Sequence, residues 1–182
     1  MKALSINAAT QEINEIEIEM QANTIYTFFG SILIDELATL NNHMIYADAN
    51  ALSEKKQAYF IGEQLLLGDA LITGREEFTD LDASITTEEL LPLVRSEVNA
   101  FYSNALEQLS ATDLNLYRTF QVKTKENEEI ALNSEWVLYT FNIADERTQE
   151  YFLNELTKAL SSGTSAEAYM QKMAGLALSA GA

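Results

Sequence analysis

Three glutamates, Glu15, Glu17 and Glu19, alternate with apolar residues in segment 15–20. The alternation predicts a strand with one buried face. On such a strand the three carboxylates point to one side, about 6.7 Å apart. That spacing is close to the spacing of successive phosphates on a nucleic-acid strand, so the row can imitate a phosphate backbone in the groove of a nucleic-acid enzyme. The same row is also typical of a solvated outer face whose glutamates discourage edge pairing.

The carboxylates are unevenly distributed along the chain. Residues 3–54 contain eight of them and no lysine or arginine, and residues 76–94 contain six, again without a base. The whole chain carries 28 acids and 11 bases, for a net charge of −17, although only 21% of its residues are charged. Such a field attracts a basic protein surface and repels nucleic acid and anionic membranes. The carboxylates predicted to contact this partner are Glu12, Glu15, Glu17, Glu19, Asp35, Glu36, Glu76, Glu77, Asp80 and Asp82.

Residues that usually carry catalysis are scarce. The chain has no cysteine, which excludes thiolate nucleophiles and disulfides. His43 is the only histidine; it follows Asn41 and Asn42 in a predicted turn, with Asp48 nearby, and an ordinary loop histidine is the favoured interpretation. No serine lies in a nucleophile elbow, and no glycine-rich loop carries a phosphate-binding lysine. We therefore predict no catalytic residues and no cofactor.

Asp80 and Asp82 have the spacing that opens a calcium loop. Such a loop needs glycine at its sixth position and glutamate at its twelfth, where this chain has Ile85 and Leu91. A segment that leads into a helix capped at Thr86 fits better, so we predict no metal site. A carboxylate-based, metal-dependent enzyme remains an alternative.

The first part of the chain alternates short strands with turns. Thr86 and Glu89 form a predicted capping box. The apolar spacing from residue 93 to 109 is typical of a helix, although Pro92 is awkward at its start. A short helix is expected over residues 25–29, ended by Gly30. The predicted strands are residues 3–6, 15–20, 32–40, 44–47, 59–61 and 66–73.

The second part is expected to begin with strands at 120–122 and 136–143. Asp145 can cap a helix that Gly163 ends, and Thr164 with Glu167 predicts a second capping box. The last helix carries an apolar stripe that is typical of core but could also form a homodimer seam. The residues of this predicted self-association surface are Tyr169, Met170, Met173 and Leu176.

Strands and helices are mixed without regular βαβ alternation, which predicts an α+β fold with a small, mostly antiparallel sheet and a helical C-terminal end. Residues 1–110 are expected to form one α+β domain. Residues 111–182 form a strand pair plus two helices that either pack on it or make a small second domain. Because the chain shows neither the apolar region of a signal peptide nor a membrane span, we expect a cytoplasmic protein.

Residues 1–110 also carry a resemblance. It rests on the opening KALSI at 2–6, the acidic strand to Glu19, DANAL at 48–52, Gly62, GDALITG at 68–74, FTDL at 78–81 and the helix that TTEE begins at 86–89. These residues resemble an uncharacterised family of small phage- and plasmid-borne bacterial proteins, a domain of unknown function. The resemblance implies a mobile-element origin and an α+β fold, and it transfers no catalytic residues.

Together these features favour a non-enzymatic, acidic interaction protein. In its sharpest form, the hypothesis is inhibition of a host nucleic-acid-binding protein by partial charge mimicry. A self-associating structural or assembly protein is the first alternative.

Overall fold

A computed structural model describes residues 1–180, apart from the side chains of residues 38, 39 and 180. The chain forms two compact units, Met1–Val98 and Asn99–Ala182. Helices, antiparallel sheets and a helical C-terminal end confirm the α+β prediction. The first unit ends before helix α3 (Ala100–Leu109), rather than after it as expected from the sequence, because α3 packs with the later helices. None of the described helices is long and apolar enough to span a bilayer.

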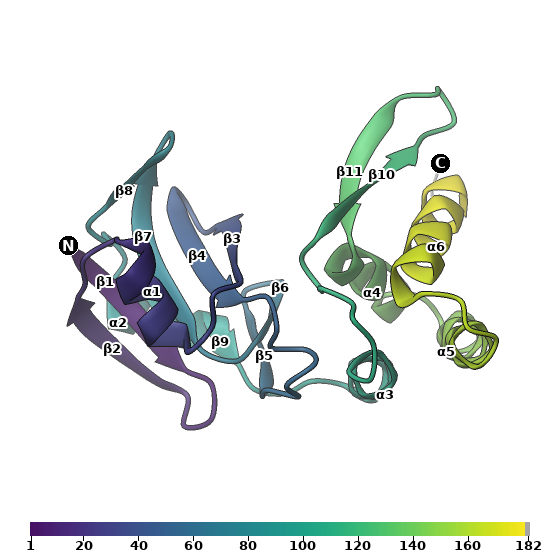
Figure 1. The fold of residues 1–182 in the computed structure, drawn as a ribbon, viewed down its shortest axis with the longest axis horizontal. Coiled ribbons are helices and arrows are strands. Elements are labelled where there is room, and N and C mark those ends of the chain that lie inside the picture. Colours follow the sequence, from purple (N-terminus) through teal and green to yellow (C-terminus); the bar gives the residue numbers. More distant parts are fainter. Residues whose placement is uncertain (181–182) are drawn as a thin grey trace. The chain divides into compact units, whose positions relative to one another are not determined.

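The first unit is built on an antiparallel sheet in the order β2-β1-β7-β4-β3, with β8 paired to β7 (Figure 1). Its strands are β1 (Lys2–Asn7), β2 (Glu12–Glu17), β3 (Ile34–Thr39), β4 (His43–Asp48), β7 (Ala70–Glu76) and β8 (Thr79–Leu81). The predicted strand at 15–20 therefore lies three residues earlier, and Glu19 is outside it. The reason is the β1–β2 turn, in which the Asn7 side chain accepts the backbone N–H groups of Ala9 and Thr10 and fixes the register.

Helix α1 (Ala22–Phe29) covers one face of this sheet, in front of it in Figure 1. It ends, as predicted, at Gly30, whose positive φ of 66° suits a residue without a Cβ. Apolar side chains of α1 pack against the apolar side chains that every second strand residue points toward the helix. This core contains Ala3, Ile18, Phe29, Met44, Tyr46 and Leu71, with Ile16, Met20, Ile25, Phe28 and Ile34 packed against it.

The opposite sheet face is also buried, because Leu4, Ile6, Ile45 and Ile72 are at most 2% exposed. A second sheet, in the order β6-β5-β9, contributes to this side through contacts between β6 and β4. Its strands are β5 (Ala58–Ile61), β6 (Gln64–Leu67) and β9 (Val94–Arg95). The predicted strand at 66–73 is thus two strands, β6 and β7, which separate at the turn of Gly68.

The predicted helix over 93–109 is wrong in its first part. The capping box of Thr86 and Glu89 is confirmed, but its helix α2 (Thr87–Leu90) is short and continues as a 3-10 turn, η1 (Leu91–Leu93), that contains Pro92. Val94 then enters β9, where it pairs with Ile61. This long-range pairing, together with the proline, overrides the helical spacing.

The second unit joins a hairpin to four helices. In its core the ring of Phe152 contacts those of Phe101, Phe141 and Tyr169, with centroid distances of 4.7–5.5 Å. The elements after α3 are β10 (Thr119–Lys123), β11 (Glu129–Asn133), α4 (Ser134–Asn142), α5 (Glu146–Ser161) and α6 (Ala166–Ala180).

The predicted strand at 136–143 is wrong, because these residues lie mostly in helix α4. Asn133 caps this helix by accepting the backbone N–H of Trp136. The Asp145 cap of α5 is confirmed. At the start of α6 the side-chain acceptor is Ser165, which receives the N–H of Ala168, rather than the predicted Thr164.

Candidate functional site

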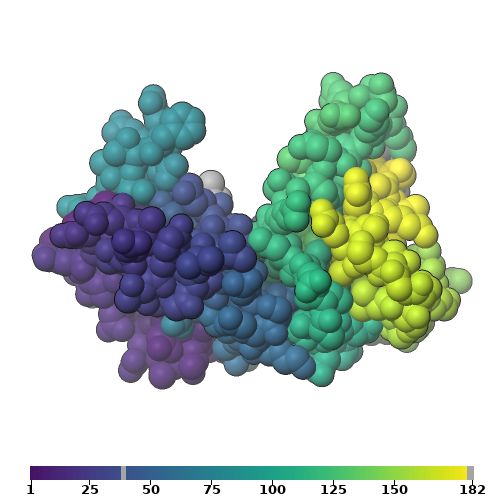
Figure 2. All heavy atoms as spheres, viewed as in Figure 1, coloured from purple at the N-terminus to yellow at the C-terminus, as the bar shows by residue number. Residues whose placement is uncertain are grey.

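Two adjoining hollows lie on the α1 side of the first unit and share Tyr26 and Ile32. Helix α1 and the loop after it, dark purple and indigo, form part of the surface seen in Figure 2. The smaller hollow, about 330 Å³, is lined by Met20, Ala22, Ile25, Tyr26, Ile32, Ile34, Glu36, Tyr46 and Asp80. The larger, about 580 Å³, is lined by Asn23, Tyr26, Thr27, Gly30, Ser31, Ile32, Asn50 and Glu54. Both hollows are largely open to solvent, so they are surface depressions rather than enclosed clefts.

The boundary between the hollows is apolar and exposed. Ile32 is 73% exposed, the adjacent Leu33 53% and Tyr26 37%. The left-handed turn at Gly30 ends α1 and leads into this loop, and Ser31 Oγ accepts the N–H of Leu33 at 3.2 Å. Apolar side chains gathered at an acidic rim are typical of a protein-interaction surface.

The polar end of the smaller hollow is organised around Asp80. Its Oδ1 accepts from Tyr46 Oη at 2.8 Å, Thr73 Oγ1 at 3.1 Å and Arg75 Nη1 at 3.2 Å. Glu36 lies on the other side of Arg75, with Oε2 at 3.5 Å from Nη2. Burial, and then the hydrogen bond to Asp80, raise the pKa of Tyr46 above its ordinary value, so its hydroxyl stays neutral and donates.

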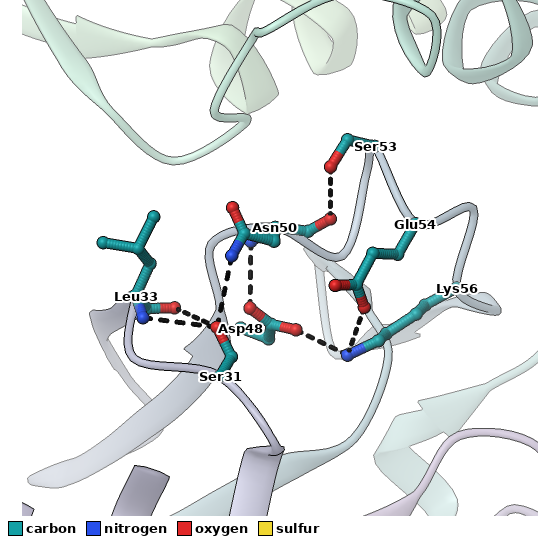
Figure 3. Close-up of polar contacts among 7 residues, drawn as sticks. All are labelled: Ser31, Leu33, Asp48, Asn50, Ser53, Glu54 and Lys56. Carbon is teal, nitrogen blue, oxygen red and sulfur yellow. Dashed lines mark hydrogen bonds and ion pairs between the residues drawn. The ribbon is translucent and has the colours of Figure 1, made fainter.

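The wall of the larger hollow is held by a second network, drawn in Figure 3. Asp48 has a fully buried side chain that pairs with Lys56 Nζ at 2.5 Å and accepts the N–H of Asn50 at 2.9 Å. Lys56 also contacts Glu54 at 3.0 Å, and Asn50 Nδ2 donates to Ser31 Oγ at 3.2 Å. Desolvation lowers the pKa of Lys56, but the hydrogen bonds to Asp48 and Glu54 outweigh it, so the pKa is raised overall. This lysine is therefore a charged structural group rather than a nucleophile.

His43 is the first residue of β4 and only 7% exposed, so the predicted loop position is wrong. Its Nδ1 donates to the Leu40 carbonyl at 2.8 Å. Its Nε2 accepts three donors at 3.1–3.2 Å, namely the backbone N–H groups of Ser84 and Ile85 and the Ser84 hydroxyl. Because the single lone pair of Nε2 is shared among three donors, His43 holds the loop at Ser84 and Ile85 in place rather than acting as a base that activates Ser84.

The predicted acidic residues fall on different parts of the first unit. Glu12, Glu15 and Glu17 lie on β2, at one edge of the sheet, whereas Asp35 and Glu36 lie on β3, at the other edge. Strands β1, β7 and β4 separate the two edges, so these residues do not form one continuous row.

The second predicted acidic group lies around the β7–β8 hairpin. Glu76 is the last residue of β7, and Glu77 is in the turn. Asp80 and Asp82 are instead engaged in hydrogen bonds within the protein. Asp80 is bound to Arg75 as described, and Asp82 Oδ1 accepts the backbone N–H of Lys2 at 2.8 Å. Within the part of the chain that the structure describes, no three potential ligands lie close enough to hold a metal ion.

The predicted self-association residues lie mainly inside the second unit. Tyr169, Met170 and Met173 are at most 4% exposed, and Tyr169 donates its hydroxyl to the Phe152 carbonyl at 2.7 Å. Leu176, at 44%, remains exposed. A contact between copies on this helix would have to use residues such as Leu176.

Sequence reasoning missed the residues that define the hollows, above all Tyr26, Ile32, Arg75 and Lys56. Ile32 and Leu33 follow Gly30 and Ser31, and their apolar character predicts the start of a strand, where such residues are expected to be buried. Nothing in the spacing of Arg75 and Tyr46 indicated their contact, which depends on the pairing of β4 with β7.

Comparison of the chain with protein-family models, with curated proteins and with solved structures found no match.

Proposed function

We propose that this chain is a non-enzymatic protein that binds a basic surface of another protein. The observation that carries the proposal is the exposed pair Tyr26 and Ile32, which lies between Glu54 in one hollow and Glu36 in the other. Apolar anchors inside a charged rim supply affinity, while the rim selects the sign of the partner's charge.

The edge strand β2 supports the same proposal. Within residues 1–180, as far as side chains are described, the ion pairs involve other carboxylates and leave out Glu15, Glu17 and Glu19. Their charge is therefore available for long-range attraction of a basic partner. The sharper form of the proposal is that the partner is a nucleic-acid-handling host protein, that β2 imitates part of a phosphate backbone, and that the chain comes from a mobile element.

The test is affinity capture from bacterial lysate with the tagged full-length chain, washed at low and high salt, with the captured proteins identified by mass spectrometry. Variants Tyr26→Ser and Ile32→Ser, combined, remove the apolar anchors. Phe78→Ser is the matched control, because Phe78 is 91% exposed but lines neither hollow. We expect one basic protein to be captured by the wild type and the control, and lost with the double variant or at high salt.

Equal capture by all these variants, or no specific capture by the wild type, would contradict the proposal. A triple change of Glu15, Glu17 and Glu19 to lysine separately tests the contribution of β2 and of the glutamate that follows it. If mimicry operates, this variant loses the partner and added DNA displaces the partner from the wild type. Intact binding by the triple variant would remove the β2 version and leave the hollows.

A further inference from the structure

We propose that the smaller hollow receives an arginine side chain of the protein partner, with Glu36 as its acceptor. The inference rests on the proposed function, because it names the group by which the partner would be recognised.

The hollow combines apolar side chains with carboxylates, the two features that a long basic side chain requires of a binding site. Met20, Ile25 and Ile34 supply apolar walls and also pack on the α1 core, which holds them in place. Long basic side chains bury their aliphatic stems along such walls while the charged head reaches a polar group. The polar groups here, Glu36 and Asp80, line the same hollow.

The two carboxylates of the hollow, Asp80 and Glu36, differ in how many hydrogen-bond and ion-pair partners they have within the protein. Asp80 accepts three donors on one oxygen and is 20% exposed, whereas the side chain of Glu36 is 54% exposed and has its ion-pair contact with Arg75 at 3.5 Å. Arg75 is itself only 17% exposed and bridges the two carboxylates. Since Tyr46 is neutral, one guanidinium stands against two carboxylates, and the group carries a net charge of about −1. A single added cation would balance it, with Glu36 as the accessible partner.

Arginine fits this site better than lysine. Its planar guanidinium can make two parallel hydrogen bonds to the Glu36 carboxylate. The ring of Tyr26 also lines the hollow and offers a face for stacking or a cation–π contact. A lysine ammonium would gain the charge interaction but not the bidentate geometry.

The experiment is a titration of the ¹⁵N-labelled full-length chain, followed by amide chemical shifts. The probes are blocked tripeptides Leu-X-Leu in which X is arginine, lysine, norleucine or citrulline, the neutral isostere of arginine. We expect shifts that concentrate at the residues lining the hollow, with affinity in the order arginine, lysine, then citrulline and norleucine. Loss of the charge should weaken binding roughly tenfold.

Two variants localise the effect. Glu36→Gln should weaken the arginine peptide roughly tenfold, while Glu63→Gln, at an exposed glutamate between β5 and β6 that does not line the hollow, should leave it unchanged. Ala22→Phe should block the hollow without altering its charge, since Ala22 lies at its rim in the first turn of α1. An unchanged amide spectrum outside the hollow shows that each variant is folded.

Equal binding of the arginine and citrulline peptides, shifts away from the hollow, or binding that is insensitive to both Glu36→Gln and Ala22→Phe would overturn the inference. Those outcomes leave the proposed function standing if the combined Tyr26 and Ile32 variant still loses its captured partner. If capture is unaffected while the arginine peptide binds selectively, the proposed function fails and the hollow is an arginine site of another kind.

Discussion

His43 Nε2 accepts the backbone N–H of Ile85, 42 residues further along the chain, at 3.1 Å. The same nitrogen accepts the N–H of Ser84, while Nδ1 donates to the carbonyl of Leu40. The imidazole therefore makes hydrogen bonds with three backbone groups, and these bonds connect the start of β4 to the segment that leads into α2.

Replacing His43 by phenylalanine keeps a ring of similar size but removes the acceptor. We expect this variant to lose about 1–3 kcal/mol of unfolding free energy, because the N–H groups of Ser84 and Ile85 lose their partner in a part-buried position. Urea unfolding measures the loss. Ser84→Ala is the control; it removes only the hydroxyl contact and should cost about 1 kcal/mol or less. Equal effects of the two changes would show that the backbone bonds to His43 are not important for stability.

The ion pair of Asp48 and Lys56 should behave as a coupled unit. Lys56→Met leaves the fully buried carboxylate of Asp48 without its cation, and we expect a loss of roughly 3 kcal/mol. Adding Asp48→Asn to that variant should recover part of the loss, because the uncompensated charge is removed. A double-mutant cycle by urea unfolding measures the coupling. Additive losses would argue that the two side chains stabilise the fold independently.

At Gly68 both the left-handed backbone conformation and the lack of room for a side chain favour glycine. Its φ is +72°, and an added Cβ would lie 2.7 Å from Cδ of Lys56. Gly62 is the matched control, with φ of +61° and nothing within 4 Å of its added Cβ. We expect Gly62→Ala to cost about 1 kcal/mol from the left-handed conformation alone, and Gly68→Ala to cost more. Thermal unfolding of both variants tests the order, and Lys56→Ala should reduce the difference by removing the crowded stem.

The Asp145 cap predicts a pH effect on the second unit. Hydrogen bonds from the backbone and hydroxyl of Thr148 hold the pKa of Asp145 below its ordinary value of 3.8. The folded pKa is lowered, so the carboxylate contributes stability above the unfolded pKa, and this contribution is lost as pH falls through the folded pKa. The difference in unfolding free energy between wild type and Asp145→Ala should therefore shrink as the pH is taken below about 4.

Asp145→Asn separates the charge from the cap, since asparagine is also a good N-cap. This variant should stay close to the wild type at neutral pH, and its difference from the alanine variant should not change with acid. A constant difference between wild type and Asp145→Ala over the acid range would contradict the assigned role. Helix content followed by circular dichroism during chemical unfolding provides the measurement.

Local signals were sufficient where a short segment satisfies its own backbone groups. The capping box of Thr86 and Glu89, the Asp145 cap and the Gly30 terminus involve residues within a few positions of one another, and all three are as predicted. The β3–β4 hairpin likewise turns at Asn41 and Asn42, in left-handed conformations that asparagine tolerates.

Hydrophobic patterns predicted the wrong secondary structure where contacts with a distant segment of the chain determined it. Segment 136–143 is rich in apolar and aromatic residues, as a buried strand would be, yet it is mostly helical, because periodicity cannot distinguish these states in a short, mainly apolar run. Val94 continues a helical spacing but pairs with Ile61, more than thirty residues earlier.

The sequence by itself determined the α+β class, the excess of acid and the local caps, since these depend on composition and on near neighbours. Only the tertiary structure decided that Glu15 and Glu36 lie on opposite edges of one sheet, that Arg75 neutralises Asp80, and that Tyr26 and Ile32 lie exposed between two hollows. The physical reason is that strand order and the position of α1 on the sheet are set by burial of the shared apolar core. That core is assembled from residues of several distant segments, so no single segment can reveal it.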